Sequence, residues 1–79
     1  MNNLRRAHID RISAKLAEFQ DEIEVLLDLE QEAFDNLPAS IQESARGEEM
    51  ESSIEQLEEA MDLFDDLISV LTEAKGEKE

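Results

Sequence analysis

The chain has 79 residues, no cysteine and a net charge of −15 at pH 7, because 22 acidic side chains outnumber seven Lys and Arg. This length allows one domain over residues 1–79, and the composition excludes disulfides and thiolate metal sites. A domain this small is marginal alone, so oligomerisation is the expected stabilising device. The negative charge disfavours direct binding to nucleic acid or anionic lipid and favours cations or a basic protein as partner.

No apolar run approaches the roughly 20 residues that cross a bilayer, and no apolar segment follows the N-terminal arginines as it would in a signal peptide. We therefore expect no membrane association and a cytoplasmic location. The lack of cysteine agrees with a reducing compartment.

The first 15 residues are basic, with four Lys and Arg against one acid, whereas the rest of the chain carries three against 21. The basic positions are Arg5, Arg6, Arg11 and Lys15, with His8 among them. In an antiparallel hairpin we expect this segment near Asp62, Asp65 and Asp66. Charge balance is the ordinary explanation, because exposed ion pairs are common and weak. The alternative is an anion-binding site, since arginines repeated in an oligomer can hold a phosphate or a nucleotide.

Apolar residues recur at alternating steps of three and four in the first half of the chain, which predicts a helix over about residues 4–35. The expected seam contains Ile9, Ile12, Leu16, Phe19, Ile23, Leu26, Ala33 and Leu37. Glu30 interrupts this seam close to the turn, where we expect its carboxylate to accept backbone N–H groups of the connecting loop. The alternatives are that it reaches water or that it fixes the register of the two helices. The helix should end near Asp35, because a residue that precedes proline is biased out of the helical region.

The main cluster of helix-breaking residues lies at about residues 36–44 and predicts a loop, in which Pro38 opens a short helical turn. Ser44 as N-cap and Gly76 as C-terminal stop predict a second helix over about residues 45–75. Its seam contains Met50, Ile54, Leu57, Met61, Phe64, Ile68 and Leu71. A short connection makes two such helices antiparallel neighbours, so the predicted fold is all-α, an antiparallel hairpin with coiled-coil-like packing.

Both helices carry further apolar residues outside their seams, and a face this wide needs more than one partner helix. We therefore predict a homodimeric four-helix bundle or a higher oligomer, with a head-to-tail two-fold dimer favoured because the two sets lie at opposite ends of the hairpin. The expected interface residues are Val25, Leu27, Leu29, Phe34, Leu63, Leu67 and Val70. The alternative is that the N-terminal segment with Leu4 and Ala7 folds over the exposed stripe.

The run from Glu32 to Gln42, followed by Ser44, Gly47, Met50 and Glu51, resembles small acidic helical proteins of bacteriophages and other mobile elements, and Phe34-Asp35-Asn36-Leu37-Pro38 is its most specific part. The resemblance covers about residues 18–75. It implies a phage or prophage setting, with the host-cell cytoplasm as the location. It implies no activity and no functional residues.

The outer face of the second helix is a ridge of acids, since nine of twelve positions between Glu48 and Glu73 are acidic and none is apolar. The candidate partner-binding residues are Glu55, Glu58, Glu59, Asp62, Asp65 and Asp66. We predict a non-enzymatic interaction protein, a phage-type inhibitor that mimics DNA and occupies a basic groove of a host defence or nucleic-acid enzyme. The alternative is an ordinary solvated face.

Two further hypotheses belong to other functional classes. An oligomeric sponge would bind a nucleotide signal at the basic N-terminal cluster. A magnesium-dependent nucleotide pyrophosphohydrolase would use acidic pairs three residues apart, such as Asp21 with Glu24 and Glu55 with Glu58, although such pairs arise by chance in a chain this acidic. We expect no catalytic residue, no metal site and no cofactor.

Overall fold

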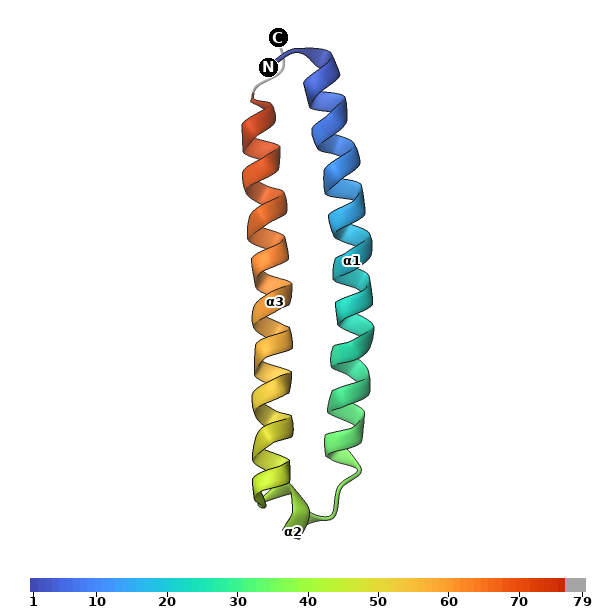
Figure 1. The fold of residues 1–79 in the computed structure, drawn as a ribbon, viewed down its shortest axis with the longest axis vertical. Helices are drawn as coiled ribbons and strands as arrows, with labels where there is room; N and C mark the ends of the chain where they lie inside the picture. Colours follow the sequence, from blue (N-terminus) through green and yellow to red (C-terminus); the bar gives the residue numbers. More distant parts are fainter. Residues whose placement is uncertain (77–79) are drawn as a thin grey trace.

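The structure, a computed structural model that describes residues 1–76, consists of two long antiparallel helices joined at one end by a short one (Figure 1). Helix α1 spans Asn3–Asp35, α2 spans Ala39–Gln42, and α3 spans Ala45–Lys75. Every regular element of the described residues is therefore helical. The sequence placed the long helices at about 4–35 and 45–75, and α2 lies where a helical turn was expected after Pro38.

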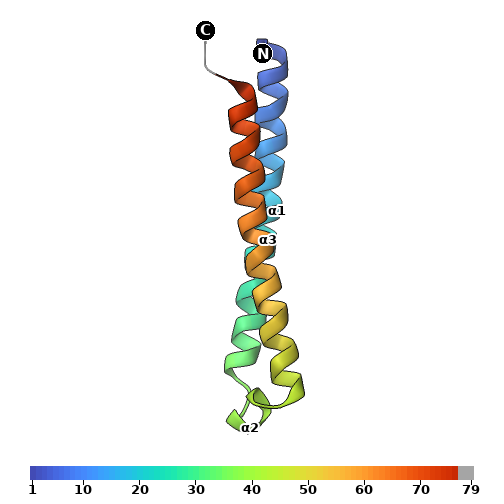
Figure 2. The ribbon, with the colours of Figure 1, turned by 90° about the vertical axis from the view of Figure 1, so that its left-hand side faces the viewer.

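The hairpin is much longer than it is wide, with extents of 60 × 15 × 13 Å. Its radius of gyration is 17.9 Å. A compact domain of this length has a radius of gyration of about 11.6 Å. Figure 2 shows that α1 and α3 cross slightly along this length, as packed helices do. Such a thin molecule has almost no interior, and Ile54, exposed by 7%, is the one buried hydrophobic side chain among the described residues.

The long helices are capped by residue types that are common at helix ends, with Asn2 and Ser44 at the N-termini and Gly76 at the C-terminus of α3. Asn2 accepts a hydrogen bond from the backbone N–H of Arg5 at 2.9 Å through its side-chain oxygen, and Ser44 accepts one from Gly47 at 3.4 Å. Gly76 ends α3 with a φ of 75°, in the left-handed region that favours glycine. These caps satisfy backbone groups that the helix termini would otherwise leave without partners.

The turn holds the two long helices in a defined relation. The Gln42 amide donates to the backbone oxygens of Phe34, at 3.0 Å, and Leu37, at 3.2 Å, which ties α2 to the end of α1. On the other side α2 packs on the first turn of α3 at Gly47, where an added Cβ would lie 2.0 Å from the Gln42 backbone oxygen. Only glycine permits this approach, so Gly47 fixes where α3 begins.

The seam between the long helices follows a regular heptad spacing on both sides. On α1 the half-buried positions are Arg6, Ile9, Ser13, Leu16, Gln20, Ile23, Leu27, Glu30 and Phe34, and Leu37 continues the spacing in the turn. On α3 the buried and half-buried seam positions include Met50, Ile54, Leu57, Met61, Phe64, Ile68 and Leu71. The seam predicted for α3 is confirmed in full.

The seam predicted for α1 is wrong at every second position. Ile12, Phe19 and Leu26 are exposed by 38%, 54% and 55%, and the neighbouring positions 13, 20, 27 and 34 face α3 instead. Both choices share Ile9, Leu16, Ile23, Glu30 and Leu37, so a small rotation of α1 separates them. The observed rotation buries Leu27 and Phe34 in place of Leu26 and the smaller Ala33, and it brings Ser13 and Gln20 into the seam in place of Ile12 and Phe19. Gln20 is accommodated there because its amide finds hydrogen-bond partners on α3.

Candidate functional site

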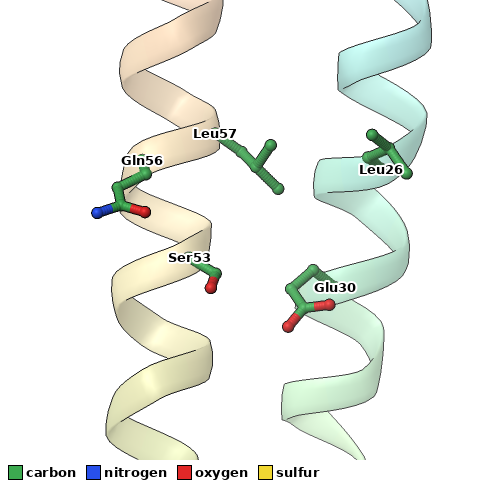
Figure 3. A pocket seen from close by; sticks show the side chains of 5 residues that line it. All are labelled: Leu26, Glu30, Ser53, Gln56 and Leu57. Atoms are coloured by element: carbon green, nitrogen blue, oxygen red, sulfur yellow. The ribbon is translucent and has the colours of Figure 1, made fainter.

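The seam divides the surface of the hairpin into two broad sides. In an antiparallel pair, the residues one position after each seam residue in the sequence lie on one side of the hairpin, on both helices. The residues one position before each seam residue lie on the other side. On the first side the Lys75 ammonium lies 2.7 Å from the Asp10 carboxylate, and the Gln20 amide donates to Asp65 at 2.7 Å. The second side bears a hollow of about 360 Å³, where Leu26 and Glu30 of α1 lie across from Leu57 and Ser53 of α3, respectively (Figure 3).

The first side, which we call the acidic face, carries eleven exposed carboxylates contributed by both long helices. They are Asp10, Asp21, Glu24, Asp28 and Asp35 of α1, and Glu48, Glu51, Glu55, Glu58, Asp62 and Asp65 of α3. No Lys or Arg of the described residues occupies a position within this face. Lys75, at the end of the seam, reaches only its Asp10 edge.

The second side, which we call the apolar face, carries seven large hydrophobic side chains that are exposed by 38–60%. They are Ile12, Phe19, Leu26 and Leu29 of α1, and Leu63, Leu67 and Val70 of α3. Ala60, Leu63, Phe64 and Leu67 line a hollow of about 180 Å³ on this face. A contiguous apolar surface of this kind marks an interaction site more often than chance exposure.

The predicted acidic ridge is divided by the structure. Glu55, Glu58, Asp62 and Asp65 belong to the acidic face, whereas Glu59 and Asp66 lie on the outward back of α3, away from α1. The sequence interpretation missed the α1 half of the face. The signal was present in the spacing of Asp21, Glu24, Asp28 and Asp35, but it could be read only with the correct seam on α1.

The basic N-terminal residues do not lie where the sequence placed them. Arg6 is half-buried and donates through Nε to the Lys75 backbone oxygen at 3.2 Å, so this segment lies beside the last turn of α3. Gln20 is the α1 residue that bonds Asp65, so the expected proximity to Asp62, Asp65 and Asp66 is wrong for the start of the segment at Arg6. The reason is the register, in which α1 starts opposite the very end of α3.

The four basic candidates also point to different sides of α1. Arg5 and Lys15 are exposed on the side of the apolar face, and Arg11 is exposed on the outward back of the helix. Arg6 lies in line with the seam, where its guanidinium bonds a carbonyl left free at the α3 C-terminus. Within one chain these residues therefore do not form a single pocket.

The expected oligomer interface needs correction at three of its seven positions. Leu27 and Phe34 are half-buried in the seam, and Val25, exposed by 57%, lies on the outward back of α1. Leu29, Leu63, Leu67 and Val70 remain together on the apolar face. The apolar surface of α1 also extends beyond the predicted set, because the Gln20 amide bonds the Met61 backbone oxygen at 3.2 Å and so places Phe19, which was assigned to the seam, level with Leu63 and Leu67.

Glu30 is half-buried, and its carboxylate points across the seam toward α3 (Figure 3). It lines the hollow of about 360 Å³ together with Leu26, Ser53, Gln56 and Leu57, and a second hollow of about 430 Å³ near Arg46. The expected hydrogen bonds from the loop are not formed within the described residues, because the helix end is closed by Gln42 instead. Glu30 therefore lies in the seam, as the sequence predicted, but its carboxylate borders these two hollows.

The acidic pairs considered for magnesium lie on the exposed acidic face. Within residues 1–76 no group of three or more His, Cys, Asp or Glu side chains is arranged to hold a metal ion. None of the helices described is both long enough and apolar enough to cross a membrane.

No protein-family model matches the chain, and no curated protein or solved structure resembles it significantly. Its function must therefore be argued from the two faces themselves.

Proposed function

We propose that the chain is a non-enzymatic, homo-oligomeric interaction protein, with a dimeric four-helix bundle favoured, whose acidic face binds a basic nucleic-acid-binding protein in place of DNA. The observation that carries this proposal is the gathering of eleven carboxylates from two helices on one side of the hairpin. A solvated helix face normally mixes both signs, because like charges one turn apart destabilise a helix. A surface that accepts this cost throughout its length is suited to a positively charged partner.

The density of charge supports mimicry of a nucleic acid. Ten of these acids, from Asp21 to Asp35 and from Glu48 to Asp65, occupy a length of about 26 Å at 1.5 Å per residue, or about one charge per 2.6 Å. Double-stranded DNA carries one charge per about 1.7 Å of its axis. The two rows lie on helices that pack about 8–10 Å apart, a separation between the widths of the minor and major grooves.

The resemblance of the turn to phage proteins supports a host protein as the partner, with inhibition of a defence or nucleic-acid enzyme in the host cytoplasm as the role. The acidic face is favoured over a nucleotide sponge because Arg5, Arg6, Arg11 and Lys15 diverge around α1, so that a nucleotide site would have to be completed by another copy, whereas one hairpin already holds the acidic face. It is favoured over a magnesium-dependent hydrolase because its acidic pairs are exposed, and the hollow of about 140 Å³ beside Glu51 and Glu55 is smaller than the roughly 300 Å³ or more of an ordinary ligand pocket.

The test is competition against labelled duplex DNA for a purified basic protein that binds DNA without sequence preference. We expect the wild-type chain to displace the duplex at low salt and to lose this ability steeply as ionic strength rises. A variant with Asp21→Asn, Asp28→Asn, Glu58→Gln and Asp62→Asn should compete at least about tenfold less well, because four contacts with cations are removed. Circular dichroism checks that its helices persist.

The matched control removes four charges from the outward backs of the helices, through Glu18→Gln, Glu32→Gln, Glu59→Gln and Asp66→Asn. It should compete nearly as well as the wild type. An equal loss in both variants would mean that net charge alone is recognised, and this outcome would refute a specific acidic face. A wild-type chain that displaces no duplex at any salt concentration would remove the mimicry proposal.

A further inference from the structure

The hairpin exposes more surface than a compact protein of its mass. It has an accessible area of 5986 Å², and its mass is 9.0 kDa. A compact monomer of that mass exposes about 4,850 Å², so the excess is about 1,100 Å². One partner in a stable dimer of ordinary size contributes about 800 Å². The excess is therefore large enough to form one such interface.

We infer that a second copy of this chain covers the apolar face, so that the apolar faces of two hairpins meet as the core of a four-helix bundle. This inference rests on the homo-oligomer proposed above and names its interface. The residues that become buried are Ile12, Phe19, Leu26, Leu29, Leu63, Leu67 and Val70. This dimer contact involves neither the acidic face nor the basic protein proposed to bind that face.

The shape of the face fits a copy of itself. The small side chain of Ala60 leaves the hollow of about 180 Å³ between Leu63 and Leu67, and its lining is apolar. Phe19 and Leu26 are exposed by 54% and 55% on the same face. The face therefore supplies both the projecting side chains and the hollow that receives them, as packing of knobs into holes requires.

Charge selects the same face for self-association. Each copy carries a net charge of −15, and contact between two acidic faces would oppose eleven carboxylates with eleven more. The side of the apolar face instead carries both signs, with Lys15 and Arg46 as well as Glu22 and Glu49. Two copies can therefore approach on this side with the least repulsion, and the cations can pair with acids across the contact.

This arrangement has a consequence for the acidic faces. Because each hairpin is one layer thick, burying its apolar face leaves its acidic face on the outside of the bundle. The dimer then presents two acidic faces on opposite outer surfaces. Both remain accessible, so self-association and partner binding do not compete.

Thiol protection tests the inference in the intact protein, because the chain has no cysteine of its own. Val70 and Val25 are the same residue type and are exposed by 59% and 57%, but only Val70 lies on the apolar face. We expect modification of the Val70→Cys thiol to slow by about tenfold or more as the protein is concentrated, because the thiol becomes buried in the dimer. The Val25→Cys thiol should react at an unchanged rate.

Sedimentation equilibrium of two further variants gives an independent measurement. Leu63→Gln with Val70→Gln should raise the dimer dissociation constant by about 100-fold or more, because both copies lose apolar contacts. Val25→Gln should leave this constant unchanged, and helicity by circular dichroism at high concentration shows whether each variant folds. A wild-type chain that stays at 9.0 kDa at every concentration would overturn the inference. Equal protection of both thiols would also overturn it, and neither outcome bears on competition with duplex DNA.

Discussion

The acidic and the apolar faces come from the same two helices and differ only by their position next to the seam. Residues that follow seam positions, such as Asp21 and Asp62, build the acidic face. Residues that precede seam positions, such as Phe19 and Leu67, build the apolar face. A rotation of either helix by one residue would mix the two sets. The hairpin thus separates charge from hydrophobic surface by helix phase alone, with no additional element.

The two faces also differ in what they can do for the stability of the chain. Burial of the apolar face would stabilise the protein, whereas the acidic face destabilises it through repulsion between like charges. The seam between them is thin, since Ile54 is the one buried hydrophobic side chain among residues 1–76. We therefore expect the hairpin to depend on what covers its apolar face, and the separation of the faces to depend on the seam.

The largest effect should follow from damage to the seam itself. Ile54→Ala removes most of a side chain that is only 7% exposed, and such truncations cost about 2–5 kcal/mol. We expect this variant to unfold at markedly lower denaturant concentration, measured at fixed protein concentration because the stability of the proposed dimer would depend on it. Val25→Ala, on the exposed back of α1, should change the free energy of unfolding by less than about 0.5 kcal/mol. Similar losses in both variants would show that the seam is not the main contact between the helices.

A smaller effect should follow from a change at the turn that sets the phase of α3. In Gly47→Ala the new Cβ would lie 2.0 Å from the Gln42 backbone oxygen and 2.5 Å from its carbonyl carbon, so α2 must move. We expect a cost of about 1–3 kcal/mol, as for other overpacked sites, measured by thermal unfolding. Ser52→Ala, on the outward back of α3, serves as a control with little effect. An unchanged melting temperature in Gly47→Ala would mean that the turn does not fix the start of α3.

The sequence predicted the helices, the turn and the α3 seam, because caps, Pro38 and heptad spacing each act locally. It could not choose between two seams on α1, because Ile12, Phe19 and Leu26 are as apolar as a seam requires. The choice depends on Gln20, which looks like a surface residue until Met61 and Asp65 provide its partners. Such pairing between residues 41 and 45 positions apart leaves no local signal.

That ambiguity propagated into the incorrect site assignments on α1. With the wrong seam, Leu27 and Phe34 were left over for an oligomer interface, and the acids of α1 had no common direction. The position of the basic cluster was mispredicted because it depends on the register between α1 and α3. The hydrogen bond from Arg6 to the Lys75 backbone sets the start of α1 beside the last turn of α3. Residue types identified what the two faces are made of, and only the packing of α1 on α3 identified which residues share a face.

The smallest expected effect is a gain in stability on neutralising part of the acidic face. It distinguishes the two faces most directly, because the preceding variants are expected to lose stability. Glu58 and Asp62 lie one turn apart on the acidic face, and Glu58→Gln with Asp62→Asn removes their repulsion. We expect a gain in stability of a few tenths of a kcal/mol at low salt, which disappears in 1 M NaCl, where charges are screened within about 3 Å. The measurement is the melting temperature of variant and wild type across a salt series. A loss of stability at low salt would mean that these carboxylates are held by favourable contacts within the hairpin. A gain in stability combined with weaker competition against duplex DNA would show that the acidic face is maintained at the expense of the fold, as a binding surface would be.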